Sequence, residues 1–200
     1  EDPVEYQLDG VNQVQVFEDI GLTFGSTLRS ILRQDPDVLL IGEIRDGETA
    51  DIAVKFSLTG HLVFSTVHAN DAPGTITRLL DIGIAPFLVG SCLNLVMAQR
   101  LVRRICNNCK EEYSATPEEL AMIGLDPGRV TDALYHGKGC TECRNTGYKG
   151  RLAIFEMIPM ARELRKLVFE NANEDDIRQA ALNNGMVTLR EAGLARVLDG

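Results

Sequence analysis

Asp35-Pro36-Asp37-Val38-Leu39-Leu40-Ile41-Gly42-Glu43 is the stretch that decides the fold of this chain. Residues 38–41 form a continuous apolar run that is too short for a helix and too apolar to face water, which predicts a buried strand. The strand ends at Glu43. A carboxylate there can hold a magnesium ion through water or orient an attacking water. The alternative is a solvated loop acid paired with Arg45, and spacing alone favours neither.

Two further polar motifs flank this strand along the chain. The first motif, Glu1-Asp2-Pro3-Val4-Glu5-Tyr6, precedes the strand. The second consists of His61 and His68, which follow the strand and flank the apolar run 62–67. A neutral imidazole both donates and accepts hydrogen bonds, so a histidine beside the terminal phosphate of a nucleotide can sense whether that phosphate is present. A single histidine at a strand end is more often structural. Two of them around one strand, followed by the helix-starting Asn70-Asp71-Ala72-Pro73, favour a functional edge.

Strand-like and helix-like stretches alternate, which predicts an α/β core. Thr116-Pro117-Glu118-Glu119 and the pair Thr188 and Glu191 are capping boxes that start helices. The chain is helical from residue 162 onward by the same criteria. The expected strands are 11–16, 38–41 and 62–66, and the expected helices are 26–33, 48–58, 73–80, 86–98 and 117–124.

Four of the five cysteines form two Cys-x-x-Cys knuckles. Four thiolates can close a tetrahedral zinc site, with the segment between them as a loop pinned at both ends. Disulfides are the competing possibility, disfavoured because no secretory signal is visible. Cys92, on an apolar stretch, is most simply a small buried hydrophobe. The predicted zinc ligands are Cys106, Cys109, Cys140 and Cys143.

The composition is that of a globular module, because 200 residues with 44% hydrophobic content can bury a core. The net charge of −9 opposes binding to nucleic acid or acidic lipid. The most apolar helix-like stretch, 86–98, is too short to span a bilayer, so we expect no direct membrane span. Arg100, Arg103, Arg104 and Lys110 form a local basic cluster, which is either a solvated surface or, as the family resemblance described below implies, a set of groups that reach phosphates or a neighbouring subunit.

Together these motifs closely resemble the type II secretion and type IV pilus assembly ATPases, over essentially all 200 residues. The resemblance rests on the Glu-Asp-Pro-Val-Glu-Tyr stretch, on Leu32–Asp37 running into Gly42–Asp46, on Thr59-Gly60-His61 with His68, and on Ala98–Leu101. It also covers the cysteine knuckles and Gly147–Arg151. The family names these segments the Asp box, the Walker B segment and the His box.

The resemblance implies a RecA-like P-loop NTPase core with a zinc-binding insertion that carries the four cysteines, and a C-terminal helical tail. By resemblance Glu43 supports hydrolysis, Glu1 and Glu5 are Asp-box acids near the metal or attacking water, and His61 and His68 are nucleotide sensors. Gly42 departs from the Walker B pattern, in which many NTPases carry Asp. The arginines assigned to the nucleotide are Arg29, Arg33, Arg45 and Arg100, of which Arg29 and Arg33 share a helix face and are either surface groups or an arginine finger.

A phosphate-cradling Gly-x-x-x-x-Gly-Lys-Ser/Thr loop is absent, since the single Gly-Lys pair is Gly137-Lys138 and residue 132 is Asp132. Family members carry this loop upstream of the Asp box, so we expect the chain to be the downstream part of a longer polypeptide and to be inactive alone. Its expected segments are 1–105 (ATPase core), 106–143 (tetracysteine subdomain) and 144–200 (strand and helices).

The resemblance also implies function, cofactors and partners. The whole motor is expected to be a cytoplasmic homo-hexamer at the bacterial inner membrane that uses ATP and Mg²⁺ and carries Zn²⁺. Its expected partners are an inner-membrane platform protein and cytoplasmic assembly proteins, and its expected task is pilus or pseudopilus assembly. Two alternatives remain: a zinc-ribbon docking module, or a structural remnant, in either case without turnover.

Overall fold

The computed structural model describes residues 1–125 and 133–200. The polypeptide divides into two compact units. Unit 1 consists of residues 1–96 and 158–185, and unit 2 consists of residues 97–157 and 186–200. The three segments expected from the sequence stay a prediction; the two units cut the chain at other points.

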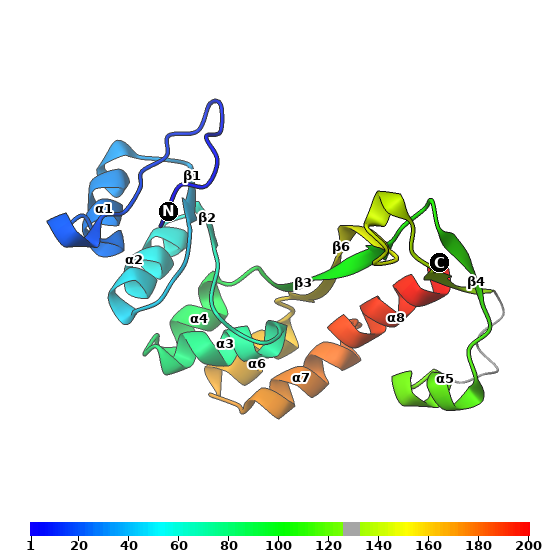
Figure 1. Cartoon of the computed structure of the whole chain (residues 1–200). Helices are drawn as coiled ribbons and strands as arrows, with labels where there is room; N and C mark the ends of the chain where they lie inside the picture. The colour runs from blue at the N-terminus through cyan, green and yellow to red at the C-terminus, as the bar shows by residue number, and fades with distance from the viewer. Residues whose placement is uncertain (126–132) are drawn as a thin grey trace. The chain divides into compact units, whose positions relative to one another are not determined.

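Unit 1 is built on two short parallel strands, β1 (Val38–Ile41) and β2 (Leu62–Ser65), in register from Val38 opposite Leu62 to Ile41 opposite Ser65. α2 (Gly47–Leu58) connects them, and α1 (Phe24–Ile31) with the 3-10 turn η2 (Leu32–Gln34) precedes β1. Figure 1 shows α1 and α2 side by side next to the strands. Each of these α-helices starts at a capping side chain, Thr23 for α1 and Asp46 for α2.

Four more helices complete unit 1: α3 (Ala72–Asp81), α4 (Pro86–Cys92), α6 (Arg162–Phe169) and α7 (Glu174–Asn183). They pack as the pairs α3–α4, α4–α6, α6–α7 and α3–α7, while α4 also contacts α2. Arg165 joins α6 to α4 by donating to the carbonyl of Gly90. Arg178 on α7 bonds Asp71, the cap of α3, at 3.0 Å. The large apolar side chains that are fully buried in this unit include Ile41, Ile76, Val89, Ile158, Leu164, Val168 and Ile177.

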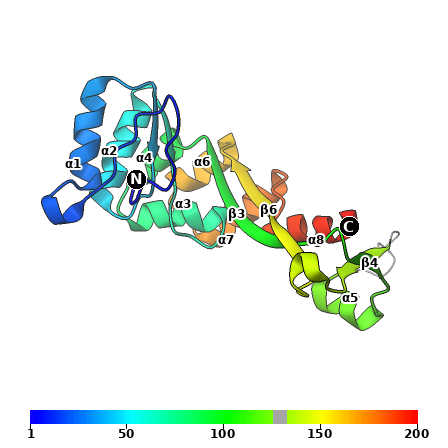
Figure 2. The ribbon, with the colours of Figure 1, turned by 45° about the horizontal axis from the view of Figure 1, so that its top comes forward.

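Unit 2 contains a ribbon of two long strands, β3 (Leu95–Ile105) and β6 (Tyr148–Pro159), which pair with each other. The strands run in opposite directions (Figure 2), and the bond from the Cys106 N–H to the Gly147 carbonyl lies at one end. α8 (Leu189–Asp199) packs on β6, where the N–H of Leu189 donates to Glu156 at 3.1 Å. The chain enters unit 2 within β3 and leaves it within β6.

The rest of unit 2 is an antiparallel pair, β4 (Lys110–Tyr113) with β5 (Leu134–Gly137), and the short helix α5 (Pro117–Ile123). Leu120, Leu125 and Leu134 form a small core against α8 residues Leu194 and Leu198. The segment 126–132, which belongs to the predicted tetracysteine region and contains Asp132, lies outside the described residues.

Most of the elements predicted from the sequence are present within two residues of their expected ends. The two capping boxes are both formed, by Thr116 with Glu119 and by Thr188 with Glu191. The strand following the second knuckle and the helices after residue 162 are also found.

Two element predictions were wrong, and so was the complete burial predicted for strand 38–41, because Val38 and Leu40 are exposed while Leu39 and Ile41 are buried. Residues 11–16 form no strand, because side-chain amides bond the loop around them: Gln13 accepts from Leu8 N–H, and Gln15 accepts from Val4 N–H. The helix predicted at 86–98 ends at Cys92, and β3 begins at Leu95. Pairing with β6 decides this segment, since Val96 and Ala98 are buried alternately with exposed neighbours, the two-residue period of a strand.

Candidate functional site

The carboxyl ends of β1 and β2 bring two predicted site residues together. Because the strands are parallel and in register, the loops after Ile41 and Ser65 leave the same edge of the sheet. Two bonds hold these loops side by side: the Ile44 N–H donates to the Thr66 carbonyl at 2.9 Å, and the Thr66 hydroxyl donates to the Gly42 carbonyl at 2.6 Å. Glu43 and His68 lie on these loops.

Glu43 is the best-anchored acid of this edge. Its side chain is 15% exposed, and its Oε2 lies 3.0 Å from Nε2 of His68, which is 87% exposed. Arg45 bonds the other carboxylate oxygen and lies 3.6 Å from Asp2. The hydrogen bond from Arg45 is the main reason that the pKa of Glu43 is lowered, with a smaller contribution from His68, while burial opposes them. The edge therefore presents a charged carboxylate held by two donors.

The Asp box lies against this edge through Glu1. A Cβ atom at Gly42 would come 3.3 Å from Cα of Glu1, so a larger side chain at residue 42 would push the two segments apart. This contact gives a physical reason for glycine where many NTPases carry Asp. The Glu1 carboxylate accepts from Gln13 at 3.0 Å, and Glu5 is exposed. Asp2 and Thr66 were missed as site residues; Asp2 stands in the same motif as Glu1.

His61 occupies the opposite end of β2. It precedes Leu62, whose N–H donates to the Asp37 carbonyl at the start of β1. The ring stacks on Phe56 with centroids 3.9 Å apart, and Nε2 lies 3.9 Å from Asp35. The structure therefore does not bring His61 together with Glu43 and His68.

The four predicted nucleotide arginines have different surroundings. Arg29 on α1 forms an ion pair with Glu48 at the start of α2, and Arg33 is exposed in η2. Arg45 bonds Glu43, as above. Arg100 belongs to β3 in unit 2, where its Nη1 donates to the Gln99 carbonyl at 2.9 Å. Only Arg45 is found at the acid edge of unit 1.

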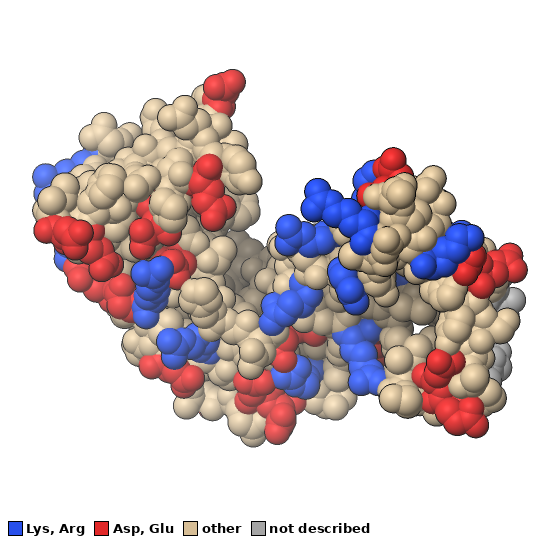
Figure 3. All heavy atoms as spheres, in the orientation of Figure 1, with Lys and Arg blue, Asp and Glu red and all other residues tan. Residues whose placement is uncertain are grey.

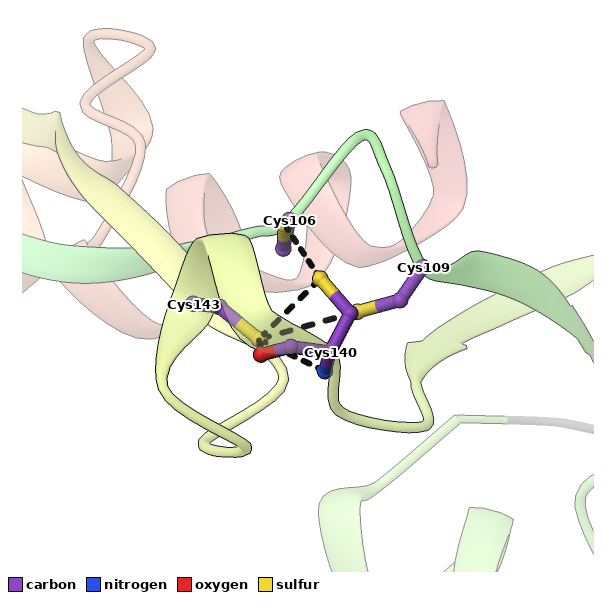
Figure 4. Close-up of side chains that lie close together, drawn as sticks. All are labelled: Cys106, Cys109, Cys140 and Cys143. Carbon is purple, nitrogen blue, oxygen red and sulfur yellow. Dashed lines mark hydrogen bonds between the residues drawn. The ribbon is translucent and has the colours of Figure 1, made fainter.

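The second candidate site is the tetracysteine cluster of unit 2. Cys106 and Cys109 follow β3, while Cys140 immediately precedes the 3-10 turn η4 (Thr141–Cys143) and Cys143 is its last residue. Figure 4 shows the four side chains directed toward one another, and their sulfurs all lie within 4.8 Å. The S···S distances are 3.9 Å for Cys106 to Cys140, 3.8 Å for Cys109 to Cys143 and 3.7 Å for Cys140 to Cys143.

These separations fit zinc. A tetrahedral site with Zn–S bonds of about 2.3 Å has sulfurs about 3.8 Å apart, whereas a disulfide bond is about 2.05 Å long. All four cysteines are free thiols, and three of them are buried. Four soft sulfur ligands in a closed shell are the donor set of structural zinc.

Hydrogen-bond donors surround the sulfurs. Burial alone would raise the pKa of Cys143, but N–H groups of Cys140 and Gly147, each 3.2 Å from its sulfur, lower this pKa to about 6. The Asn108 amide donates to the Cys140 sulfur at 3.2 Å and is the main cause of the lowered pKa of Cys140. Burial raises the pKa of Cys109 to about 12.

Two glycines beside the second knuckle allow the backbone segments there to approach each other closely. A Cβ atom at Gly137 would lie 2.0 Å from the carbonyl oxygen of Gly147, and Gly147 itself has a positive φ of 77°.

Comparison with known proteins places these sites in context. The sequence profile of the family described as "Type II/IV secretion system protein" matches residues 1–200. The chain is 51% identical to the type IV pilus assembly ATPase PilB of Myxococcus xanthus, covering 100% of this chain and 36% of that protein. It is 48% identical to type II secretion system protein E of Pseudomonas aeruginosa, covering 100% and 39%. The chain thus spans well under half the length of these relatives.

Solved structures show the same fold. The structure of the pilus retraction motor PilT with bound ADP aligns with a TM-score of 0.59 and 27% identity, over 96% of this chain and 50% of that one. The ATPase DotB of Legionella pneumophila aligns with a TM-score of 0.55 and 20% identity, over 92% and 42%, which supports the fold alone. Within residues 1–125 and 133–200, every helix is too short or too polar to cross a membrane.

Proposed function

The chain belongs to the type II/IV secretion system protein family, and we propose that it forms the downstream part of a magnesium-dependent hexameric ATPase that powers pilus or pseudopilus assembly. The supporting observation is the Glu43 carboxylate, anchored by Arg45 and His68 at the carboxyl ends of two parallel strands. The biological task in this proposal, pilus assembly or type II secretion, is taken from the names of the two relatives. We also propose that the whole protein acts at the bacterial inner membrane, with an inner-membrane platform protein and cytoplasmic assembly proteins as its partners.

In this proposal Glu43 orients the attacking water and accepts its proton, while Arg45 and His68 hold the carboxylate in place. Bound Mg²⁺ supplies charge neutralisation at the transferred phosphate, and Glu43, Glu1 and Glu5 are the residues that would hold it through water. His68 is 87% exposed, so it would turn toward a phosphate by giving up its bond to Glu43. The role of His61 as a second sensor rests on the family motif alone.

A replacement of Glu43 by Gln in the full-length polypeptide, at its own chromosomal locus, tests the biological role. We expect surface pili or secreted protein to be lost while the protein is still produced at its normal level. The control is Glu163→Gln on α6, an exposed acid of unit 1. Unchanged piliation and secretion in the Glu43→Gln strain would contradict the proposal.

The tetracysteine cluster supports a second candidate, a zinc-stabilised docking module without turnover for a platform or assembly protein. The observation in its favour is that all four cysteines lie in unit 2, whereas Glu43 lies in unit 1. A full-length polypeptide without a P-loop would favour this candidate over the motor.

A further inference from the structure

The ribbon of β3 and β6 is strongly basic in an acidic chain. β3 and β6 together contain five Lys or Arg and one acid, Glu156, although the whole chain has 29 acids and a net charge of −9. Figure 3 shows Lys and Arg side chains gathered over this ribbon. The five cations are Arg100, Arg103, Arg104, Lys149 and Arg151.

Four of these cations share one face of the ribbon. Side chains alternate between the two faces of a strand, so Arg100 lies on the same face as Arg104, and Lys149 on the same face as Arg151. Arg104 and Lys149 line one hollow beside Cys106, which joins the two pairs. We call Arg100, Arg104, Lys149 and Arg151 the basic face. The other face of β6 carries Ile154 and Glu156, which pack on α8.

The hollow is suited to a carboxylate. It measures about 330 Å³, and Arg104, Asn107, Asn108 and Lys149 provide donors around it. Glu142 already bonds Lys149 there at 2.5 Å, so a carboxylate fits this place. Among the residues that the structure describes, Arg104 and Arg151 form no ion pair. Their charge is therefore left for a partner.

The strand edges supply a second kind of contact. Within the described residues this sheet has two strands, of 11 and 12 residues, so each strand keeps one edge without a neighbour. Such an edge presents backbone N–H and C=O groups at which an extended peptide can add a strand. A peptide added at the free edge of β6 would place alternate acidic side chains beside Arg151, on the ribbon face that also carries Arg104 on β3.

We propose that the basic face and the adjoining strand edge dock an extended, acidic peptide segment of a partner protein. A peptide is favoured over an anionic membrane or a nucleic acid by charge. A large polyanion meets the field of the whole chain, whose net charge is −9. A short peptide meets mainly the charges within the screening length of about 10 Å at 0.1 M salt, which at this face are basic.

Fluorescence anisotropy tests the proposal with a labelled peptide as long as β6 in which Glu alternates with Val. We expect the chain to bind it, with affinity falling as salt rises, and not to bind the same peptide with Gln in place of Glu. Arg104→Glu combined with Arg151→Glu should weaken binding about tenfold or more. The control double variant, Arg162→Glu with Arg196→Glu, has the same net charge but lies on α6 and α8, and should keep the wild-type affinity.

If charge reversal prevents folding, the neutral double variant Arg104→Gln with Arg151→Gln provides a second test. It should also lower the affinity for the Glu peptide, but by less than charge reversal. Equal losses in the ribbon variant and the control, or equal binding of the Glu and Gln peptides, would overturn the proposal. Tighter binding to phosphatidylglycerol vesicles or to single-stranded DNA than to the peptide would also overturn it, in favour of that ligand.

Discussion

Nε2 of His68 lies 3.0 Å from Oε2 of Glu43, so the side chain that follows β2 bonds the carboxylate that follows β1. Together with Arg45, this contact holds the acid charged and lowers its pKa below the ordinary 4.5. A lowered carboxyl pKa stabilises the folded state above pH 4.5, and that stability is lost as the pH falls through the lowered value.

The first prediction concerns this pH dependence. Glu43→Gln should reduce the free energy of unfolding at pH 7, and the difference from wild type should shrink below the lowered pKa of Glu43, where the wild-type carboxyl is also neutral. Urea unfolding at the two pH values measures it. The exposed Glu163→Gln variant should show a smaller change between them; a pH-independent difference for Glu43→Gln would contradict the ion-pair account.

The second prediction concerns the metal. The purified chain should contain about one zinc, because four thiolates complete a closed site. Cys140→Ser should lose this zinc and much of the stability of residues 106–143, since structural zinc is worth on the order of 10 kcal/mol in small peptides. Cys92→Ser, outside the cluster, should keep the zinc. Elemental analysis with thiol titration decides: no metal and blocked thiols would indicate disulfides instead.

The third prediction concerns Asn108, whose amide bonds the Cys140 sulfur at 3.2 Å. Asn108→Ala should weaken zinc binding roughly 10- to 100-fold, the usual effect of losing a donor to a metal ligand. Asn107→Ala is the matched control, since Asn107 is the adjacent residue in the same knuckle and is exposed like Asn108. Chelator competition gives both affinities, and equal affinities for the two variants would show that the Asn108 contact contributes nothing.

The sequence predicted the parts of the fold that depend on local chemistry. The apolar runs of β1 and β2, the capping boxes and the cysteine spacing each carry their own signal. β3 was missed because its first residues continue the apolar, helix-like stretch 86–98, and only pairing with β6, more than forty residues later in the chain, makes this segment a strand.

The part of the candidate site that lies on strand-end motifs could also be predicted from the sequence. Glu43 and His68 both belong to the functional edge expected from the sequence, and the structure brings them within 3.0 Å of each other. His61 carries the same kind of motif but precedes its strand, so the strand direction, which separates it from Glu43, matters more than the residue type. Asp2 reaches the site through Arg45, a contact that only the folded loop creates.

The fourth prediction follows from the absence of a phosphate-binding loop in this sequence. Most ATP affinity in a P-loop enzyme comes from the loop lysine and backbone amides, whereas Glu1, Glu5 and Glu43 repel a triphosphate that lacks bridging Mg²⁺. The 200-residue chain alone should therefore hydrolyse no ATP and bind Mg-ATP weakly or not at all. Micromolar affinity by calorimetry, or turnover by the isolated chain, would reveal a phosphate site elsewhere.

The most direct test of the account is the rate of Mg-ATP hydrolysis by the purified full-length polypeptide with Glu43→Gln. This change keeps the shape of the side chain and removes the charge beside the attacking water. We expect turnover to fall about 100-fold or more while ATP binding stays close to wild type. Turnover equal to wild type, in a variant that folds and binds ATP, would contradict the assignment of Glu43.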